Sequence, residues 1–179
     1  FDLAISNTRA EIDAIANATA PATFENTIEA LAFSGMPLDR LSSIFFNLHA
    51  AETNDQLEQI AQDVAPKLSE LGNDITLNFK LFNRIKQVYD QNEKLQLTSE
   101  QITLLEKNYK DFVRNGALLA EDKKDQLRAI DSELSLLKLK YGEHVLADTN
   151  AYELHITAET DLAGLPDGVK EAAAALAKS

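Results

Sequence analysis

Several residue types and patterns are absent or scarce in this chain of 179 residues. It has no cysteine, which excludes disulfides, thiolate zinc sites and a cysteine nucleophile. No stretch approaches the roughly 20 apolar residues that a membrane-spanning helix needs. No basic segment followed by an apolar one opens the chain, so we expect no targeting segment. Six glycines and four prolines are few enough for a globular helical protein.

Positive charge is also scarce. The chain has 17 Lys and Arg against 29 Asp and Glu, a net charge of −12. Its largest basic cluster is the pair Lys123-Lys124, which acidic residues flank. Nucleic acids and anionic membrane surfaces require concentrated positive charge. We therefore expect neither a nucleic acid nor a membrane among the partners of this protein.

Apolar residues recur at intervals of three and four along most of the chain, which is the spacing of amphipathic helices. Start and stop signals divide this pattern into about seven helices. Helices are predicted to begin after Thr23, after residues 53–54, near Asn78 and after residues 98–99, and Gly116 ends the last of these. The predicted fold class is all-α, an antiparallel helical bundle, and the length suffices for one core.

Pro66 lies inside the fourth predicted helix. Proline removes one backbone hydrogen bond, and its ring crowds the carbonyl of Gln62. We therefore expect a kink or a break in the helix at this point.

The longest predicted helix runs from about residue 121 to about residue 147. Its apolar positions form a narrow seam of Leu127, Ile130, Leu134, Leu137, Tyr141 and His144. Such a seam suits either packing along a helix of the same chain or a coiled-coil dimer. Two to three heptads are short for a coiled coil, so we favour packing within the chain.

Residues 151–157 show a different period, because Tyr152, Leu154 and Ile156 alternate with polar side chains. This alternation predicts one half-buried strand. A strand must pair its backbone groups, and the sequence offers no second clear strand. Its partner is therefore expected outside the chain or in another molecule.

The chain divides by pattern into two parts. Residues 1–150 form the predicted helical region. Residues 151–179 hold the strand-like segment and then an Ala-rich helix start after Pro166, which has no stop signal. We expect the chain to end within an element.

Candidate catalytic residues are few, beginning with the histidines at 49, 144 and 155. No two of them have the i, i+4 spacing that places two imidazoles around zinc. His144 continues the seam and is expected to be packed or partly buried. His49 ends a helix, where a capping or surface role is favoured. His155 lies on the polar side of the predicted strand and is expected to face solvent.

The acidic clusters at residues 121–122 and 63–70 lack the glycine-centred spacing of calcium loops. We interpret both as solvated faces. Residues 164–168 lack the Lys-Ser/Thr ending of a phosphate loop, and no serine lies in a Gly-x-Ser-x-Gly turn. We assign no catalytic, cofactor-binding or metal-ligating residue in this chain.

Six segments in order resemble the N-terminal part of the thimet-oligopeptidase-like zinc metallopeptidases, and the bacterial peptidyl-dipeptidase branch most closely. They are TFENTIEAL at 23–31, FFNLHAAETNDQL at 45–57, APKL at 65–68, LEKNYKDFVRNG at 105–116, YGEHVLADTN at 141–150 and LAGLP at 162–166. Each segment alone is weak, since each is largely a capped amphipathic helix. Their number and order carry the resemblance over nearly the whole chain.

The resemblance implies a parent hydrolase with a nearly all-helical, two-lobed fold and a channel between the lobes. In that family a His-Glu-x-x-His helix and a downstream glutamate hold zinc, which polarises the peptide carbonyl. Peptidyl-dipeptidases release C-terminal dipeptides from short peptides. The motif does not occur in these 179 residues, so no zinc ligand can be placed here, and the metal is expected only in the parent.

By the same resemblance, this region would form part of the channel roof that restricts access. Its partners would be the remaining catalytic lobe of its own chain and, for the parent, short peptides. The cytoplasm is the expected compartment, with the periplasm as the alternative. The rival interpretation is a self-standing helical module that binds a partner helix along its long seam and has no enzymatic activity.

Overall fold

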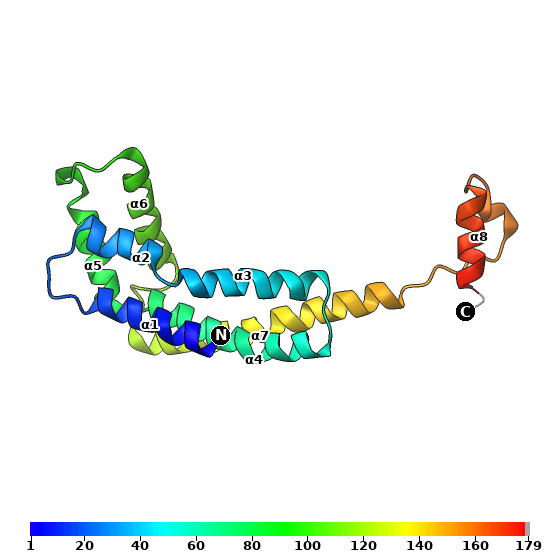
Figure 1. Ribbon diagram of the computed structural model, residues 1–179, viewed down its shortest axis with the longest axis horizontal. Helices are drawn as coiled ribbons and strands as arrows, with labels where there is room; N and C mark the ends of the chain where they lie inside the picture. The colour runs from blue at the N-terminus through cyan, green and yellow to red at the C-terminus, as the bar shows by residue number, and fades with distance from the viewer. Residues whose placement is uncertain (178–179) are drawn as a thin grey trace. The chain divides into compact units, whose positions relative to one another are not determined.

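The computed structural model describes residues 1–177 and confirms the all-α fold class (Figure 1). Within these residues there is no strand. The helices are α1 (Asp2–Ala16), the π-helical turn η1 (Phe24–Glu29), α2 (Ala30–Phe33), α3 (Met36–Ala51), α4 (Asp55–Thr76), α5 (Phe79–Asp90), the 3₁₀ turn η2 (Asn92–Lys94), α6 (Ser99–Arg114), α7 (Glu121–Ala151), the 3₁₀ turn η3 (Glu159–Leu162) and α8 (Asp167–Leu176).

The chain forms two compact units, Phe1–Tyr141 and Gly142–Ser179. The division falls within α7, before the boundary at residue 150 that the sequence pattern predicts. In the first unit, α3 and α4 lie side by side as an antiparallel hairpin, and α5 and α6 form a second hairpin (Figure 1). The turn η1 packs against both α5 and α6.

The helices begin at the predicted caps because those side chains supply the acceptors that free backbone N–H groups need. The Thr23 hydroxyl accepts from the N–H of Asn26 at 3.2 Å, and the Asn26 side chain accepts from the N–H of Thr23. Thr98 makes the same reciprocal box with Gln101. Single acceptors at the starts of α4 and α5 come from Asn54 and Asn78.

Two turns require glycine. Gly35 precedes α3 with φ 72°, and its N–H donates to the Glu11 carboxylate at 2.8 Å. Gly116 follows α6 with φ 98°, where a Cβ atom would meet side chains of Leu119 and Leu127 at 2.9 Å. Both positions combine a left-handed backbone with close packing, which only glycine accommodates without strain.

The core lies where α1, η1, α5 and α6 meet. Four large side chains from these elements are completely or almost completely buried: Ile28, Leu81, Ile85 and Leu105. Around them Phe82 stacks against Phe112 and Tyr109, and Tyr89 stacks on Tyr109 with ring centroids 4.0 Å apart. Burial of this aliphatic and aromatic surface is the main stabilising contribution in the first unit.

Arg84 is a buried cation beside this core, 7% exposed. Its guanidinium donates to the carbonyls of Ala18 and Ala20 at 3.0 and 2.9 Å. It also donates to the side chains of Asn26 and Thr27. A buried charge needs several hydrogen bonds to offset its lost hydration. Here these bonds fix the loop between α1 and η1 against α5.

Of the kink or break predicted at Pro66, the break does not occur, because α4 continues through it from Asp55 to Thr76. Ala61 and Val64 before the proline and Leu71 after it are all buried. Packing on both sides of Pro66 therefore holds the two halves in one helix despite the backbone bond that proline removes.

Of the seam predicted on the long helix, only Leu127 is half-buried, and the rest does not pack within the described chain. Ile130, Leu134, Leu137 and Tyr141 are 42–73% exposed. We call these four residues the α7 face. The side of α7 that packs on the first unit is mostly polar, with buried Lys124 and then half-buried Leu127, Arg128, Asp131 and Ser135. Polar contacts described below determine this orientation, and a count of apolar residues could not reveal them.

The strand predicted at 151–157 does not form within the described residues of this chain. Ala151 ends α7, and residues 152–157 are irregular. A β-strand requires a second strand for backbone hydrogen bonding, and residues 1–177 contain none. The predicted helix start after Pro166 is α8, which ends at Leu176.

Candidate functional site

His49 lies at the junction of α3 and α4 and is part of a half-buried polar group. Its Nε2 lies 3.1 Å from a carboxylate oxygen of Glu58, and the two side chains are 17% and 23% exposed. The Thr53 hydroxyl donates to the other oxygen of Glu58 at 3.0 Å. Phe45 stacks on the imidazole. This arrangement links the last turn of α3 to the first turn of α4.

The other two histidines belong to the second unit. His144 is exposed, so the expectation of a packed or partly buried side chain is wrong, because the seam it continues is itself uncovered. His155 is exposed as expected and lies 3.0 Å from the carboxylate of Glu153. Among residues 1–177, no three His, Asp or Glu side chains come together in a way that could hold a metal ion.

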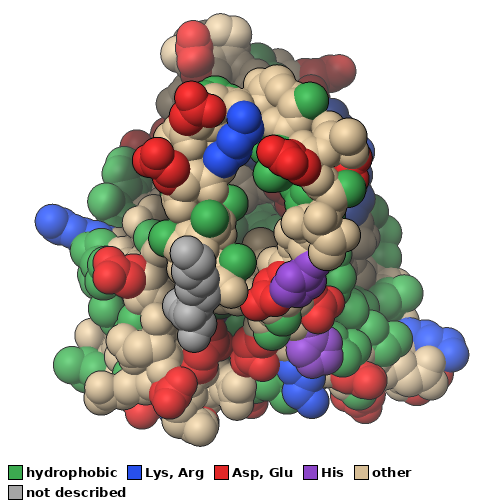
Figure 2. Space-filling view, turned by 90° about the vertical axis from the view of Figure 1, so that its right-hand side faces the viewer, with side chains coloured by type: hydrophobic (Ala, Val, Ile, Leu, Met, Phe, Trp, Pro, Cys, Tyr) green, Lys and Arg blue, Asp and Glu red, His purple; other side chains and the backbone are tan. Residues whose placement is uncertain are grey.

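The two acidic clusters have the solvated character expected of them. Glu121 begins α7, where an acidic side chain favours the positive helix terminus, and its carboxylate accepts from Lys124 at 2.9 Å. Asp63 and Glu70 are exposed on α4. On the face drawn in Figure 2, acidic side chains are spread among apolar ones, and Lys and Arg side chains are isolated.

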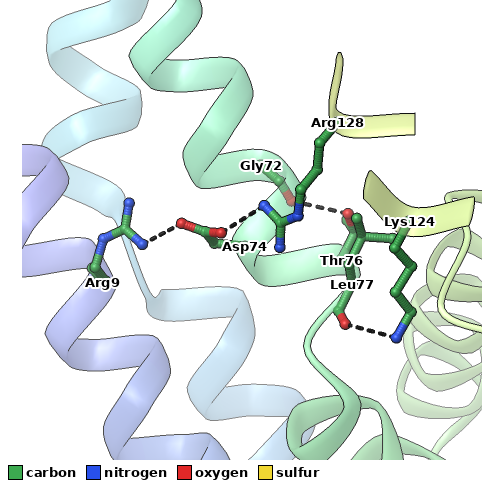
Figure 3. Close-up of polar contacts among 7 residues, drawn as sticks. All are labelled: Arg9, Gly72, Asp74, Thr76, Leu77, Lys124 and Arg128. Atoms are coloured by element: carbon green, nitrogen blue, oxygen red, sulfur yellow. Dashed lines mark hydrogen bonds and ion pairs between the residues drawn. The ribbon is translucent and has the colours of Figure 1, made fainter. Parts of the chain in front are cut away.

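Asp74 on α4 is the centre of the main polar contact between helices (Figure 3). One of its carboxylate oxygens accepts from Arg9 on α1, and the other accepts from Arg128 on α7 at 2.7 Å. A carboxylate between two guanidiniums joins three helices at one point. The side chains remain 27–43% exposed, so water weakens the attraction.

Lys124 makes the second contact between α4 and α7. Its side chain is almost entirely buried, and its ammonium donates to the backbone carbonyl of Leu77 at 3.3 Å, one residue beyond the end of α4 (Figure 3). Together, Lys124 and Arg128 place the polar side of α7 against the first unit. The apolar α7 face consequently faces away from it.

Helix α3 carries a second uncovered apolar surface, which we call the α3 face: Met36, Pro37, Leu41, Ile44 and Leu48. Four of these residues and Arg40 line a shallow depression of about 460 Å³. The 16 residues of α3 include only one acidic and one basic side chain, Asp39 and Arg40, besides His49. Contiguous exposed apolar surface of this kind marks interaction sites.

Sequence reasoning missed the Asp74 contact and the α3 face, and it favoured packing of the α7 seam within the chain. Asp74 is 65 residues from Arg9 and 54 from Arg128, so no local pattern joins them. A signal does exist in α7, because Lys124, Arg128 and Asp131 lie at helical spacing on one side. Long basic side chains can bury their stems while their charged ends find acceptors.

No helix in the described part of the chain combines the length and apolarity required to cross a bilayer.

Comparison with known proteins gives a consistent set of relatives, although no family model matches the chain. It is 38% identical over 165 residues to a dipeptidyl carboxypeptidase of Salmonella typhimurium, which covers 92% of this chain and 24% of that protein. The dipeptidyl carboxypeptidase of Escherichia coli is also 38% identical, over 167 residues. Oligopeptidase A of Salmonella typhimurium is 27% identical over 98% of this chain and 26% of its own length. The chain thus spans about a quarter of the length of these curated relatives.

Proposed function

Since this chain is homologous to the dipeptidyl carboxypeptidases and oligopeptidases A of the thimet-oligopeptidase family, we propose that it is the N-terminal helical region of a zinc metallopeptidase. The relatives are peptidases, and the chain matches only a part of each. Hydrolysis of peptides by the parent is therefore the function that the comparisons support best.

The parent is proposed to be of the peptidyl-dipeptidase type, releasing dipeptides from the C-termini of short peptides. The observation that carries this choice is the identity of 38% to two dipeptidyl carboxypeptidases, against 27% to an oligopeptidase A. The cytoplasm is the proposed compartment, with the periplasm as the alternative.

Zinc, in this proposal, is bound by residues outside the present chain. The three histidines do not form a His-Glu-x-x-His motif. They also do not join acidic side chains in a metal-binding group among residues 1–177. The donor set for catalytic zinc is therefore not supplied here, and the region itself is proposed to be catalytically silent.

The role proposed for this region is structural: part of a roof over the substrate channel. The α3 and α7 faces support this role, because they are apolar surfaces available to the rest of the polypeptide. Short peptides would pass such a roof, and folded proteins would be excluded.

Activity measurements on the complete polypeptide and on residues 1–179 alone test this proposal. The complete polypeptide should release C-terminal dipeptides from tri- to pentapeptides and should lose this activity when a chelator is added. It should not cleave peptides whose C-terminus is amidated. The 179-residue chain should be inactive with or without zinc. Zinc-dependent dipeptide release by the short chain would overturn the assignment.

A roof should also lie near bound substrate. A peptide carrying a photoreactive group at its N-terminal end is expected to crosslink to residues 1–179 of the complete enzyme. Crosslinks confined to the remainder of the enzyme would contradict this part of the proposal.

The alternative function is a self-standing helical interaction module. The exposed α7 face favours it, since a partner helix fits such a stripe. The open reading frame distinguishes the two: continuation into a His-Glu-x-x-His motif supports the peptidase, and a stop codon after Ser179 supports the module.

A further inference from the structure

Residues 152–157 combine two properties of a strand without its partner. Tyr152, Leu154 and Ile156 are 73%, 70% and 41% exposed, and they alternate with Glu153, His155 and Thr157. In an extended chain, alternate residues share one side. The segment therefore has one apolar side, Tyr152, Leu154 and Ile156, and one polar side.

The backbone of this segment is unpaired in the described chain. The N–H of Tyr152 reaches the carbonyl of Thr149 at 3.4 Å, and the next non-helical backbone bond along the chain is that from Asp161 to Ala158. In between, the residues 153–157 have no backbone hydrogen bond to another described segment. Backbone groups of this kind need protein partners once the apolar side is buried.

We propose that residues 152–157 form a β-strand by pairing with an extended segment of the same polypeptide outside these 179 residues. Pairing would bury Tyr152, Leu154 and Ile156 against the remainder of the polypeptide. It would also give the backbone N–H and C=O groups of this segment hydrogen-bond partners. Addition of an extended segment to a strand edge uses main-chain bonds for affinity and alternate side chains for specificity.

The length of the relatives is the reason to place the partner in the same polypeptide. Roughly three quarters of each relative's sequence lies outside the matched part. This step rests on the proposed function, which makes the chain a region of such a longer protein. A covalently linked partner meets this segment at a higher effective concentration than a separate molecule does, which favours pairing of a short strand.

Charge argues against a second copy as the partner. Each chain has a net charge of −12, so two copies repel each other as they approach. A covalently attached partner does not depend on overcoming this repulsion at each encounter.

Residue-resolved hydrogen exchange by NMR on the complete polypeptide and on the 179-residue chain tests the proposal. In the complete polypeptide, alternate amides between 152 and 157 should exchange about a hundredfold or more slowly than in the short chain. Equal exchange in both would overturn the proposal. Slow exchange in the short chain that increases with protein concentration would also overturn it, in favour of a second copy.

Two matched variants of the complete polypeptide separate pairing from general folding. Leu154→Asp places a charge on the apolar side and should abolish the slow exchange at 152–157. His155→Asp places the same charge on the polar side and should leave it within about threefold of the unsubstituted protein. Equal effects of both variants would contradict the assigned sides.

These readouts do not depend on catalysis. Slow exchange in a complete polypeptide without peptidase activity would support the strand and reject the proposed function. Peptidase activity with rapid exchange at 152–157 would support the proposed function and reject the strand.

Discussion

The units Phe1–Tyr141 and Gly142–Ser179 contain similar secondary structure but bury their side chains very differently. The first has a core of buried aliphatic and aromatic residues. In the second, no residue from 142 to 177 is buried, and only Glu143, Leu162 and Lys170 are half-buried. Isolated helices of this length are marginal in water, so helical content does not measure independent stability. Packing makes the first unit stable, and the second requires a partner.

The largest difference in stability is expected when one side chain in each unit is truncated. Phe82→Ala removes an almost completely buried ring and should lower the free energy of unfolding by about 3–5 kcal/mol. Leu154→Ala in the 179-residue chain should change it by less than about 0.5 kcal/mol, because that side chain is exposed. Urea unfolding measures both, and comparable losses would refute the contrast.

A smaller effect is expected at Arg84. Arg84→Met keeps most of the side-chain volume but leaves the carbonyls of Ala18 and Ala20 without their donor. Loss of these hydrogen bonds from a buried charged donor should lower the free energy of unfolding by about 2 kcal/mol. Lys86→Met, on the exposed side of the same helix, is the control and should cost about 0.5 kcal/mol or less. If the two variants unfold at the same urea concentration, Arg84 has no such role.

The next effect concerns α7, within which the division of the chain into two units falls. Asp74→Asn removes the charge between Arg9 and Arg128 and should destabilise the chain by about 1 kcal/mol, since the group is partly exposed. The control Asp63→Asn lies exposed on the same helix. A double-mutant cycle with Arg128→Met should give a coupling energy between the two side chains. A coupling energy of zero would mean that the contact contributes nothing to stability.

The smallest effect is a pH dependence at the start of α1. The hydrogen bond from Lys67, together with its charge, lowers the pKa of the Asp2 carboxyl. A lowered folded-state pKa contributes stability above the unfolded-state pKa, and this contribution is lost as pH falls through the folded-state value. NMR titration of Asp2 should show the lowered pKa, and Lys67→Met should return it toward its ordinary value. An identical titration in both proteins would exclude the pair.

Local features of the fold were predictable because they depend on neighbouring residues. Thr23, Asn54 and Thr98 cap helices as their sequence contexts predict, and Gly116 ends α6 with positive φ. The all-α class follows from the same local periodicity.

Features that depend on distant residues were not predictable in the same way. The apolar seam of α7 is exposed beyond Leu127 because Arg128 binds Asp74 on α4 and Lys124 binds the carbonyl of Leu77 just after α4, both more than 40 residues away. Pro66 is accommodated by packing on both sides. The segment 152–157 has the pattern of a strand, but a strand requires a second one that these residues do not contain. The absence of a His-Glu-x-x-His motif, by contrast, was evident from the sequence alone.

Hydrogen exchange of the 179-residue chain, resolved by residue, tests the central contrast most directly. Amides of α5, such as those of Leu81 and Ile85, should exchange only through global unfolding, whereas amides from 152 to 177 should exchange at nearly the rates of an unstructured peptide. Protection at 152–177 equal to that of α5 in a monomeric chain would contradict the account.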